Sequence, residues 1–311
     1  MADHEATELL PIGRVVAELR RAYPDVSHSS LRFLEREGLV VPHRTPGGHR
    51  LYAQHDLDRI RQIKAWQAQR LSLQEIRHRL AALRDLGAPG AVADRFLAAA
   101  LAGDLARAAR VVRDADELGM PLERLFGDVL RPSLYAVGEG WARGEVPVGQ
   151  EKEVSELARD LIAELARRHA DPDPCGPTVV AAAVAGERHD LGLRMVAGLL
   201  RERGWRVHFL GADVEPRFLL EAVRLRRPAV VLLSATTEAR LPTVAEAVAA
   251  LRADGTAGAV PVVVGGGQAV AAHAEALRAW GAVPASEDGL DAVLAALPVG
   301  LARGRGHAPS P

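Results

Sequence analysis

An imidazole and a carboxylate lie close together in the segment Gly186-Glu187-Arg188-His189-Asp190-Leu191-Gly192. One ring nitrogen of His189 could bind a metal ion, while Glu187 holds the other nitrogen, fixes the tautomer and raises the basicity of the ring. Gly192 carries no side chain, which lets the backbone approach a bulky ligand. An exposed loop histidine without a ligand would give the same motif, so its surroundings must decide.

Small or hydroxyl-bearing residues end three further apolar runs: Gly211 after Trp205–Leu210, Ser234 at the end of Ala229–Ser234, and Gly265-Gly266 after Val260–Val264. A hydroxyl and a run of glycines on adjacent strand ends could line a deep slot between a sheet and its helices. A dinucleotide site is the competing interpretation of the glycines. It is disfavoured because no Gly-x-Gly-x-x-Gly follows the first strand.

Strands and helices must alternate to position these residues. The predicted strands are Thr178–Ala185, Trp205–Leu210, Ala229–Ser234, Val260–Val264 and Val283–Ala285, and the helices between them are Leu191–Arg203, Pro216–Leu225, Val244–Asp254 and Val270–Trp280. Continuous apolar strands separated by helices predict a doubly wound, parallel, five-stranded Rossmann-like sheet, with its ligand at the carboxyl ends of the strands. We expect this domain over 177–300, with a last helix over 287–299 and a disordered tail over 301–311.

The four elements, in this order and spacing, resemble the cobalamin-binding domains of methionine synthase and of mutases. The resemblance implies that His189 replaces the dimethylbenzimidazole of the cofactor as the lower axial ligand of cobalt, with Glu187 beside it. It also implies a cofactor site completed by Gly192, Gly211, Ser234, Gly265 and Gly266, of which Ser234 and the last two glycines line the slot for the displaced nucleotide tail.

Residues 91–170 have helical periodicity, interrupted at Gly103-Asp104, at Gly119-Met120-Pro121 and between Gly144 and Pro147. Such breaks predict a four-helix bundle. Trp141, followed after nine residues by Glu151, is similar to the cap bundle of the cobalamin-dependent MerR photoreceptors of the CarH/LitR group. The resemblance implies that both residues cover the upper face of adenosylcobalamin, with Trp141 near the adenosyl group and Glu151 accepting hydrogen bonds from it. A core tryptophan is the alternative for Trp141.

Lys152 departs from that pattern, because this photoreceptor group has histidine there. The histidine is associated with capture of cobalt after light removes the adenosyl group. A lysine amine is mostly protonated near neutral pH and ligates a metal only if burial strongly depresses its pKa. Light sensing therefore stays open for this chain, although Lys152 belongs to the expected cofactor site.

The N-terminal segment has the side chains that DNA recognition needs. Helices are predicted over Val15–Tyr23, from Ser27 onward, over Gln54–Arg70 and over Leu73–Leu83, the last with a capping box that starts at Ser72. Short side chains let the second helix approach a groove, and arginines reach phosphates or guanine edges. The expected DNA contacts are Ser29, Ser30, Arg32 and Arg36 on this helix, and Arg44, His49, Arg50 and Tyr52 on a two-stranded wing that turns at Pro46-Gly47-Gly48.

The segments Leu31 to Leu39 and Arg44 to Tyr52, followed by Leu71 to Ile76, resemble the winged helix-turn-helix of the MerR regulators. This resemblance covers about residues 10–80 and implies binding of a double-stranded DNA operator as a homodimer or homotetramer. The turn Ala22 to Val26 is longer than usual, which leaves the target sequence undefined. The cysteine-bearing helix of the metal-sensing branch is absent, so another signal is required.

Bulk properties restrict the remaining classes. The chain has 311 residues, a single cysteine, Cys175, and a formal net charge of -1. One cysteine excludes an internal disulfide framework and fits a reducing compartment. The acidic start has no signal-peptide pattern, and no apolar run reaches the length of a membrane span. The sequence therefore predicts a cytoplasmic protein without a membrane partner.

These features together predict a multidomain α and α/β protein. The winged domain would occupy 1–85, the bundle 91–170 and the cobalamin-binding domain 177–300. The main hypothesis is a light-responsive repressor without enzymatic turnover, in which adenosylcobalamin controls oligomerisation and operator binding. The alternatives are a light-independent sensor of cobalamin level or form, a corrinoid methyl-carrier subunit, and a regulator whose site has changed to another cofactor. The winged domain argues against the methyl carrier, which needs no operator.

Overall fold

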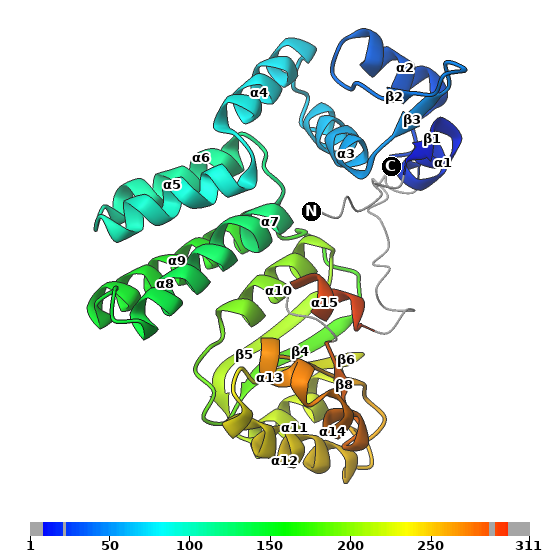
Figure 1. Cartoon of the computed structure of the whole chain (residues 1–311). Helices are drawn as coiled ribbons and strands as arrows, with labels where there is room; N and C mark the ends of the chain where they lie inside the picture. The colour runs from blue at the N-terminus through cyan, green and yellow to red at the C-terminus, as the bar shows by residue number, and fades with distance from the viewer. Residues whose placement is uncertain (1–8, 21–22, 286–289, 298–311) are drawn as a thin grey trace. The chain divides into compact units, whose positions relative to one another are not determined.

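The computed structural model describes residues 9–20, 23–285 and 290–297 of the chain (Figure 1). The chain forms two compact units: residues up to 88 together with 117–121 make the first, and residues 89–116 with those from 122 onward make the second. The predicted tail over 301–311 and the first eight residues lie outside the described residues.

The first unit is a small helical domain with one antiparallel sheet. Its elements are β1 (Leu10–Pro11), α1 (Ile12–Leu19), α2 (His28–Arg36), β2 (His43–Arg44), β3 (Arg50–Tyr52), α3 (Gln54–Ala68) and α4 (Leu73–Leu86). The strand order β1-β3-β2 shows that the predicted two-stranded wing gains a third strand from the segment before α1. The sequence does not predict this strand, because the two residues Leu10 and Pro11 are too few to show strand periodicity.

Local hydrogen bonds explain where its helices begin. Ser27 caps α2: its hydroxyl accepts from the Ser30 amide, and its own amide donates to the Ser30 hydroxyl. The predicted capping box at the start of α4 is confirmed, since Ser72 and Glu75 exchange the same pair of bonds. These contacts satisfy amide groups that the first helical turn leaves without partners.

The second unit opens with the four-helix bundle that the helix breaks predict. It contains α5 (Pro89–Leu101), α6 (Leu105–Glu117), a third helix built from α7 (Leu122–Arg124), a π-helical turn (Leu125–Leu130) and α8 (Arg131–Ala142), and then α9 (Val148–Arg168). Buried alanine, valine, leucine and phenylalanine fill the space between the helices. The bundle core therefore needs few aromatic side chains, because small residues let the helices pack closely.

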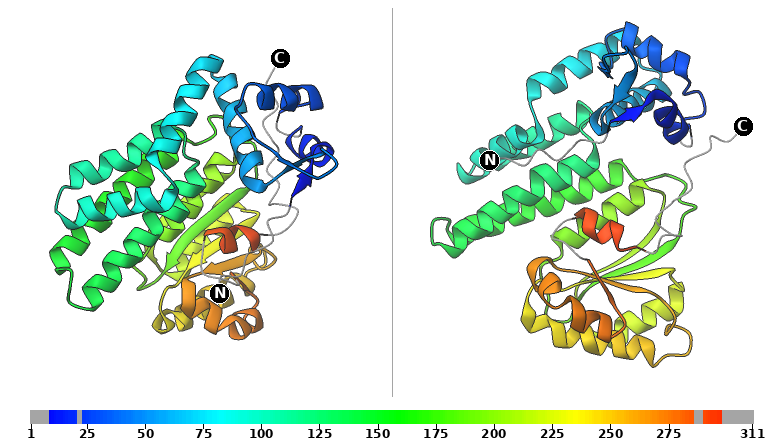
Figure 2. Two further views of the ribbon diagram at one scale, coloured as in Figure 1. Left: turned by 45° about the horizontal axis from the view of Figure 1, so that its top comes forward. Right: turned by 45° about the vertical axis from the view of Figure 1, so that its right-hand side comes forward.

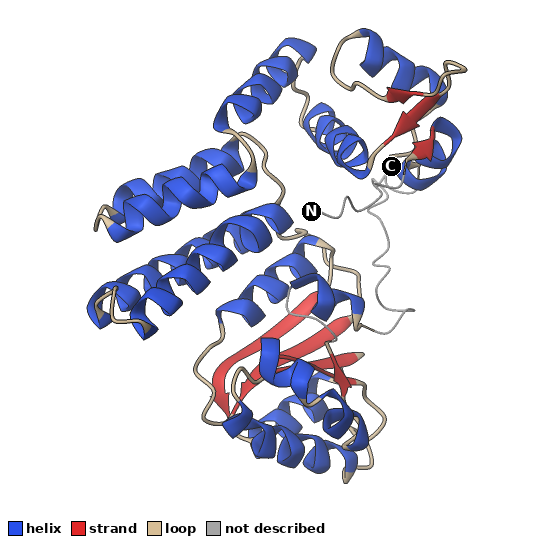
Figure 3. Ribbon diagram, viewed as in Figure 1, coloured by secondary structure: helices blue, strands red, loops and turns tan. Residues whose placement is uncertain are grey.

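The sheet that follows the bundle is entirely parallel (Figure 3). Its strands are β4 (Thr178–Val184), β5 (Arg206–Val214), β6 (Val230–Ser234), β7 (Val262–Gly265) and β8 (Val283–Pro284), in the order β5-β4-β6-β7-β8. Valine, leucine and alanine occupy both faces of the central strands β4, β6 and β7, which are buried, whereas the edge strand β5 is partly exposed. The predicted doubly wound five-stranded sheet is confirmed.

Helices cover both faces of this sheet (Figure 2). One face packs on α11 (Pro216–Arg226), α12 (Leu241–Arg252), α13 (Gly267–Ala272) and α14 (Ala274–Ala279). The other face lies beneath α10 (Leu191–Glu202) and α15 (Leu290–Ala295). A parallel sheet requires such double cover, because its strands carry apolar side chains on both sides.

Several boundaries differ from the prediction: α1 covers Ile12–Leu19 instead of Val15–Tyr23, α12 begins at Leu241 instead of Val244, and two further differences change the geometry of the sheet domain. β5 runs four residues further than expected, to Val214, and includes a register shift beside Gly211. The expected helix Val270–Trp280 is two short helices, α13 and α14, which meet at His273. A β-bulge and a helix break depend on neighbouring strands and loops, which hydrophobic periodicity does not report.

The bundle and the sheet domain pack together through α9 and α10. A Cβ atom on Gly198 of α10 would lie 3.0 Å from both the Ala166 Cβ of α9 and the Phe126 ring. Arg159 of α9 also donates to the buried Asp190, which precedes α10, at 2.7 Å. Gly198 therefore permits the close contact between α9 and α10. The ion pair of Arg159 with Asp190 fixes the end of this contact that lies nearest to His189.

A second polar contact ties the start of the interdomain linker to the bundle. The buried Asp116 carboxylate binds Arg168 and His169, which end α9 and begin the linker. The hydrogen bond from Asp116 raises the pKa of His169 more than burial lowers it. Burial would raise the pKa of Asp116, but the bonds from His169 and Arg168 lower it below its ordinary value.

We expect this contact to make the stability of the second unit depend on pH. Because the folded-state pKa of His169 is raised, its stabilisation is complete below about pH 6.5 and is lost as pH rises through the folded value. His169→Gln should therefore cost about 1–2 kcal/mol of unfolding free energy at pH 6 and less at pH 9. Urea unfolding at both pH values measures this, and an equal loss at both would contradict it.

Candidate functional site

The strand order creates one crevice at the carboxyl edge of the sheet. From β4 the chain crosses to β5 on one side and then to β6 on the other side of β4. Parallel sheets bind ligands where the order reverses in this way. The loop after β4 carries His189 and the loop after β6 carries Ser234 to Thr236, so the two predicted segments meet at this crevice.

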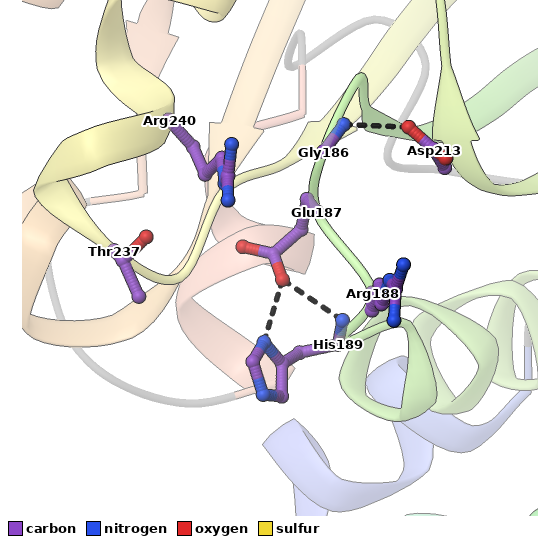
Figure 4. Close-up of a pocket in the computed structure, with 7 residues that line it drawn as sticks. All are labelled: Gly186, Glu187, Arg188, His189, Asp213, Thr237 and Arg240. Atoms are coloured by element: carbon purple, nitrogen blue, oxygen red, sulfur yellow. Dashed lines mark hydrogen bonds and ion pairs between the residues drawn. The ribbon is translucent and has the colours of Figure 1, made fainter.

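Glu187 holds His189 in place (Figure 4). One oxygen of the Glu187 carboxylate lies 2.6 Å from Nδ1 of His189 and accepts from the His189 amide at 2.8 Å. The Glu187 side chain is 2% exposed, whereas that of His189 is 74% exposed. All hydrogen bonds between the His189 ring and the described residues involve Nδ1. The other ring nitrogen, Nε2, points away from Glu187 and can bind a metal.

Thr236 completes this arrangement from the neighbouring strand. The other oxygen of Glu187 accepts from the Thr236 amide at 2.7 Å and from its hydroxyl at 2.6 Å. Thr236 was not among the predicted site residues, although its place directly beyond the end of a buried strand was an available signal. One carboxylate thus links the loops after β4 and β6.

The hydrogen bonds set the charges of the pair. Burial alone would raise the pKa of Glu187, but four bonds from His189 and Thr236 hold it at about 2. The bond from Glu187 raises the pKa of His189 above its ordinary value, more than burial lowers it. Glu187 is therefore an anion near neutral pH. In the neutral His189 ring, this anion favours a proton on Nδ1 and leaves the lone pair on Nε2.

Asp213, which was also absent from the predicted site residues, fixes the loop from the side of β5. Its carboxylate accepts from the Gly186 amide at 2.6 Å, and its own amide donates to the Glu187 carbonyl at 3.0 Å. Asp213 has a φ of 57°, which few residues other than glycine adopt. A pocket of about 370 Å³ opens here, lined by Gly186, Glu187, Arg188, His189, Asp213, Thr237 and Arg240.

The slot residues gather at the ends of β6 and β7. Ser234 pairs with Gly265 across these strands and is buried, without a side-chain hydrogen bond to any described residue. A Cβ atom on Gly266 would overlap the Ala235 carbonyl oxygen, and one on Gly265 would lie 2.9 Å from Val293 of α15. The two glycines therefore bring β7 and its loop close to the neighbouring backbone and to α15.

The other two predicted glycines face open space. A Cβ atom on Gly192 or on Gly211 would meet no described atom within 4 Å. Gly192 lies in the first turn of α10, next to the His189 loop, where open space fits a bulky ligand. Gly211 has a φ of 93° at the register shift of β5, so the strand geometry alone explains it.

The bundle contributes the residues that the cap motif indicates. Trp141 on α8 is 51% exposed, which excludes the core tryptophan considered above. Glu151 in the first turn of α9 accepts from Ser155 at 2.8 Å and pairs with the exposed Lys152 at 3.0 Å. The charges of Glu151 and Lys152 both act on the pKa of His189, so the start of α9 lies near the imidazole.

These observations fit a cobalamin. A single exposed imidazole nitrogen is the donor that axial ligation of cobalt requires, and no group of three or more metal-ligating side chains occurs among the described residues. The Ser234 hydroxyl, which has no partner among the described residues, offers a polar group to such a ligand at the strand ends, whereas close contacts with α15 and with the Ala235 backbone already account for Gly265 and Gly266.

The predicted DNA-binding side chains of α2 divide into two groups. Ser29, Arg32 and Arg36 are exposed. Ser30 is occupied by the helix cap, where its hydroxyl donates to the Ser27 carbonyl at 3.0 Å. Arg36 also lies 5.4 Å from the Phe33 ring centre, which supports its side chain along the helix surface.

The wing is tightly closed. The Thr45 amide donates to the His49 carbonyl at 2.9 Å, and the His49 amide donates to the Thr45 hydroxyl at 3.1 Å. Arg44 and His49 are exposed and Arg50 is half-buried. Tyr52 is buried in the core of the unit and its hydroxyl has no hydrogen-bond partner, so in this conformation it cannot reach a DNA groove as expected.

No helix among the described residues combines the length and the apolar character that crossing a membrane requires.

Comparisons with known proteins match this architecture. Residues 9–83 match the MerR HTH family of regulatory proteins, and residues 92–166 and 177–294 each match a B12 binding domain. The fold of a monomethylamine corrinoid protein from Methanosarcina barkeri is similar, with a TM-score of 0.56 at 21% identity, over 66% of this chain and 97% of that one.

Two curated relatives extend over most of the chain. It is 32% identical over 250 residues to the HTH-type transcriptional repressor CarH of Myxococcus xanthus. The matched region covers 75% of this chain and 82% of the relative. It is 30% identical over 265 residues to the repressor CarA of the same organism, with 83% and 88% covered. The chain therefore belongs to the CarH-like family of cobalamin-binding, MerR-type transcriptional regulators.

Proposed function

We propose that this regulator is a cytoplasmic repressor in which adenosylcobalamin, held between the bundle and the sheet domain, controls self-association and operator binding. The observation that carries the proposal is the exposed Nε2 of His189, oriented by a carboxylate that Thr236 anchors. No enzymatic turnover is needed, because ligand binding that favours one assembly over another is sufficient for regulation.

Each part of the site has a separate task. His189 would hold the cobalt from below, while Ser234, Gly265 and Gly266 would receive the nucleotide tail. Trp141 would shield the upper face from water, and Glu151 would accept hydrogen bonds there. Bound adenosylcobalamin would supply a light-sensitive cobalt–carbon bond. Because Arg159 ties α9 to the His189 loop through Asp190, a change at the upper face would alter the packing of α9 on α10.

Lys152 supports a second candidate, a sensor of cobalamin level or form that does not respond to light. Lys152 pairs with Glu151 and its side chain is exposed, and a lysine ammonium has no lone pair to offer to cobalt. The two candidates share the cofactor and the operator and differ only in the signal.

We expect His189→Ala to abolish the base-off, His-on absorption spectrum that the protein should show with adenosylcobalamin in the dark. Glu187→Gln should weaken cofactor binding by about 10–100-fold, because the ring loses its fixed tautomer and orientation. Absorption titrations measure both effects. His208→Ala, in β5 of the same domain, serves as the control, and an unchanged spectrum in His189→Ala would refute axial ligation.

Illumination should separate the two candidates. A light-responsive repressor should change its elution volume in size-exclusion chromatography and lose DNA affinity in gel shifts after green or blue light. Lys152→His should enhance or restore the response, because a neutral imidazole can bind cobalt near neutral pH. If oligomer and DNA affinity stay the same in the dark and in the light, the light-responsive proposal is wrong and the cofactor-level sensor remains.

Arg32→Ala and Arg50→Ala should each weaken DNA binding about tenfold without altering cofactor uptake, because they remove contacts to bases or phosphates. Tyr52→Phe is the matched control on the same wing. It removes only a buried hydroxyl that has no partner, so DNA affinity should not change. Gel shifts and cofactor titrations of the same preparations measure both properties, and loss of affinity in Tyr52→Phe would assign the phenol a DNA contact.

A further inference from the structure

Glu35, near the end of the recognition helix α2, binds both strands of the wing. One oxygen of its carboxylate accepts from Arg44 at 2.5 Å, and the other accepts from Arg50 at 2.5 Å. Arg44 lies on β2 and Arg50 on β3, directly opposite each other in the antiparallel ladder. Two cations in facing positions repel each other, so the ladder needs an anion between them.

Side-chain exposure places this carboxylate beneath the two arginines. The Glu35 side chain is 19% exposed, whereas Arg50 is 25% and Arg44 is 51% exposed. Burial would raise the pKa of Glu35, but the bonds from Arg50 and Arg44 lower it, which keeps the group ionised. The cluster therefore has an acidic base and a basic outer surface, with one net positive charge.

Each guanidinium keeps unused donors. Arg50 engages Glu35 through Nε alone and Arg44 through one terminal nitrogen, and their other nitrogens bind no acceptor among the described residues. A guanidinium carries five N–H donors in a fixed planar fork. The nitrogens of each guanidinium that do not bind Glu35 are thus left for a ligand at the surface, such as a DNA backbone.

We propose that Glu35 is a positioning residue for operator binding: it holds Arg44 and Arg50 as a paired clamp for DNA phosphates, although its own charge repels them. This inference rests on the proposed DNA-binding function and adds to it an acidic residue that carries no DNA contact of its own. If Glu35 orients the arginines, its neutralisation should weaken DNA binding. If only its negative charge matters, the same change should strengthen DNA binding, so the two roles can be told apart.

Glu35→Gln should weaken binding of the full chain to a fluorescent 30-base-pair duplex of mixed sequence by about tenfold, as expected for lost charge-assisted hydrogen bonds. Phosphate contacts are independent of sequence, so this probe needs no operator. Anisotropy titrations at several KCl concentrations should also give a salt slope smaller by about 1–2, since each phosphate contact contributes about 0.9. If loss of the negative charge were the only effect of Glu35→Gln, DNA binding would instead become tighter and its salt slope steeper.

Glu18→Gln on α1 makes the same change of charge in the same unit, where the carboxylate pairs with Arg61 and not with the wing, and it should not weaken binding. In an Arg44→Ala/Arg50→Ala background, Glu35→Gln should lose its effect. Equal or tighter binding by Glu35→Gln, with wild-type protein binding normally, would overturn the positioning role and leave the proposed function intact. If the wild type does not bind the duplex at any salt concentration, both are refuted.

Discussion

The site depends on one buried carboxylate that serves two strands. Glu187 binds the imidazole on its own loop with one oxygen and the backbone and hydroxyl of Thr236 with the other. A buried anion is costly unless its oxygens are paired, and here each oxygen accepts two bonds. The histidine orientation and the junction of β4 with β6 are therefore set by the same group.

The loop that carries His189 is held from three directions. Glu187 anchors it to β6, Asp213 anchors it to β5, and Asp190 anchors it to α9 of the bundle. A ligand bound at Nε2 of His189 would therefore contact a loop that is also bonded to the bundle. Since α9 also packs on α10 through Gly198, this contact offers a physical route from the proposed cofactor site to the helices of the bundle.

Hydrophobic periodicity and loop residues predicted most of this arrangement. The order of strands and helices, the bundle breaks and the meeting of His189 with the β6 end all followed from local pattern, because a parallel sheet leaves few possible topologies. The missed residues are those whose role requires a distant partner. Thr236, Asp213 and Asp190 are ordinary in sequence, and only the fold brings them to the loop. Tyr52 shows the opposite error, since an aromatic beside wing arginines gives no sign of being buried.

The third helix of the bundle carries a further consequence. Its π-helical turn, Leu125–Leu130, contains Phe126, which faces Gly198, and precedes Trp141, which is exposed near the helix end. Each residue added to or removed from a helix rotates everything beyond it by about 100°. Shortening this wide turn by one residue would swing the indole to another side of the bundle while its neighbours in sequence stayed the same. The direction of Trp141 is therefore encoded by segment length, at a distance from the indole itself.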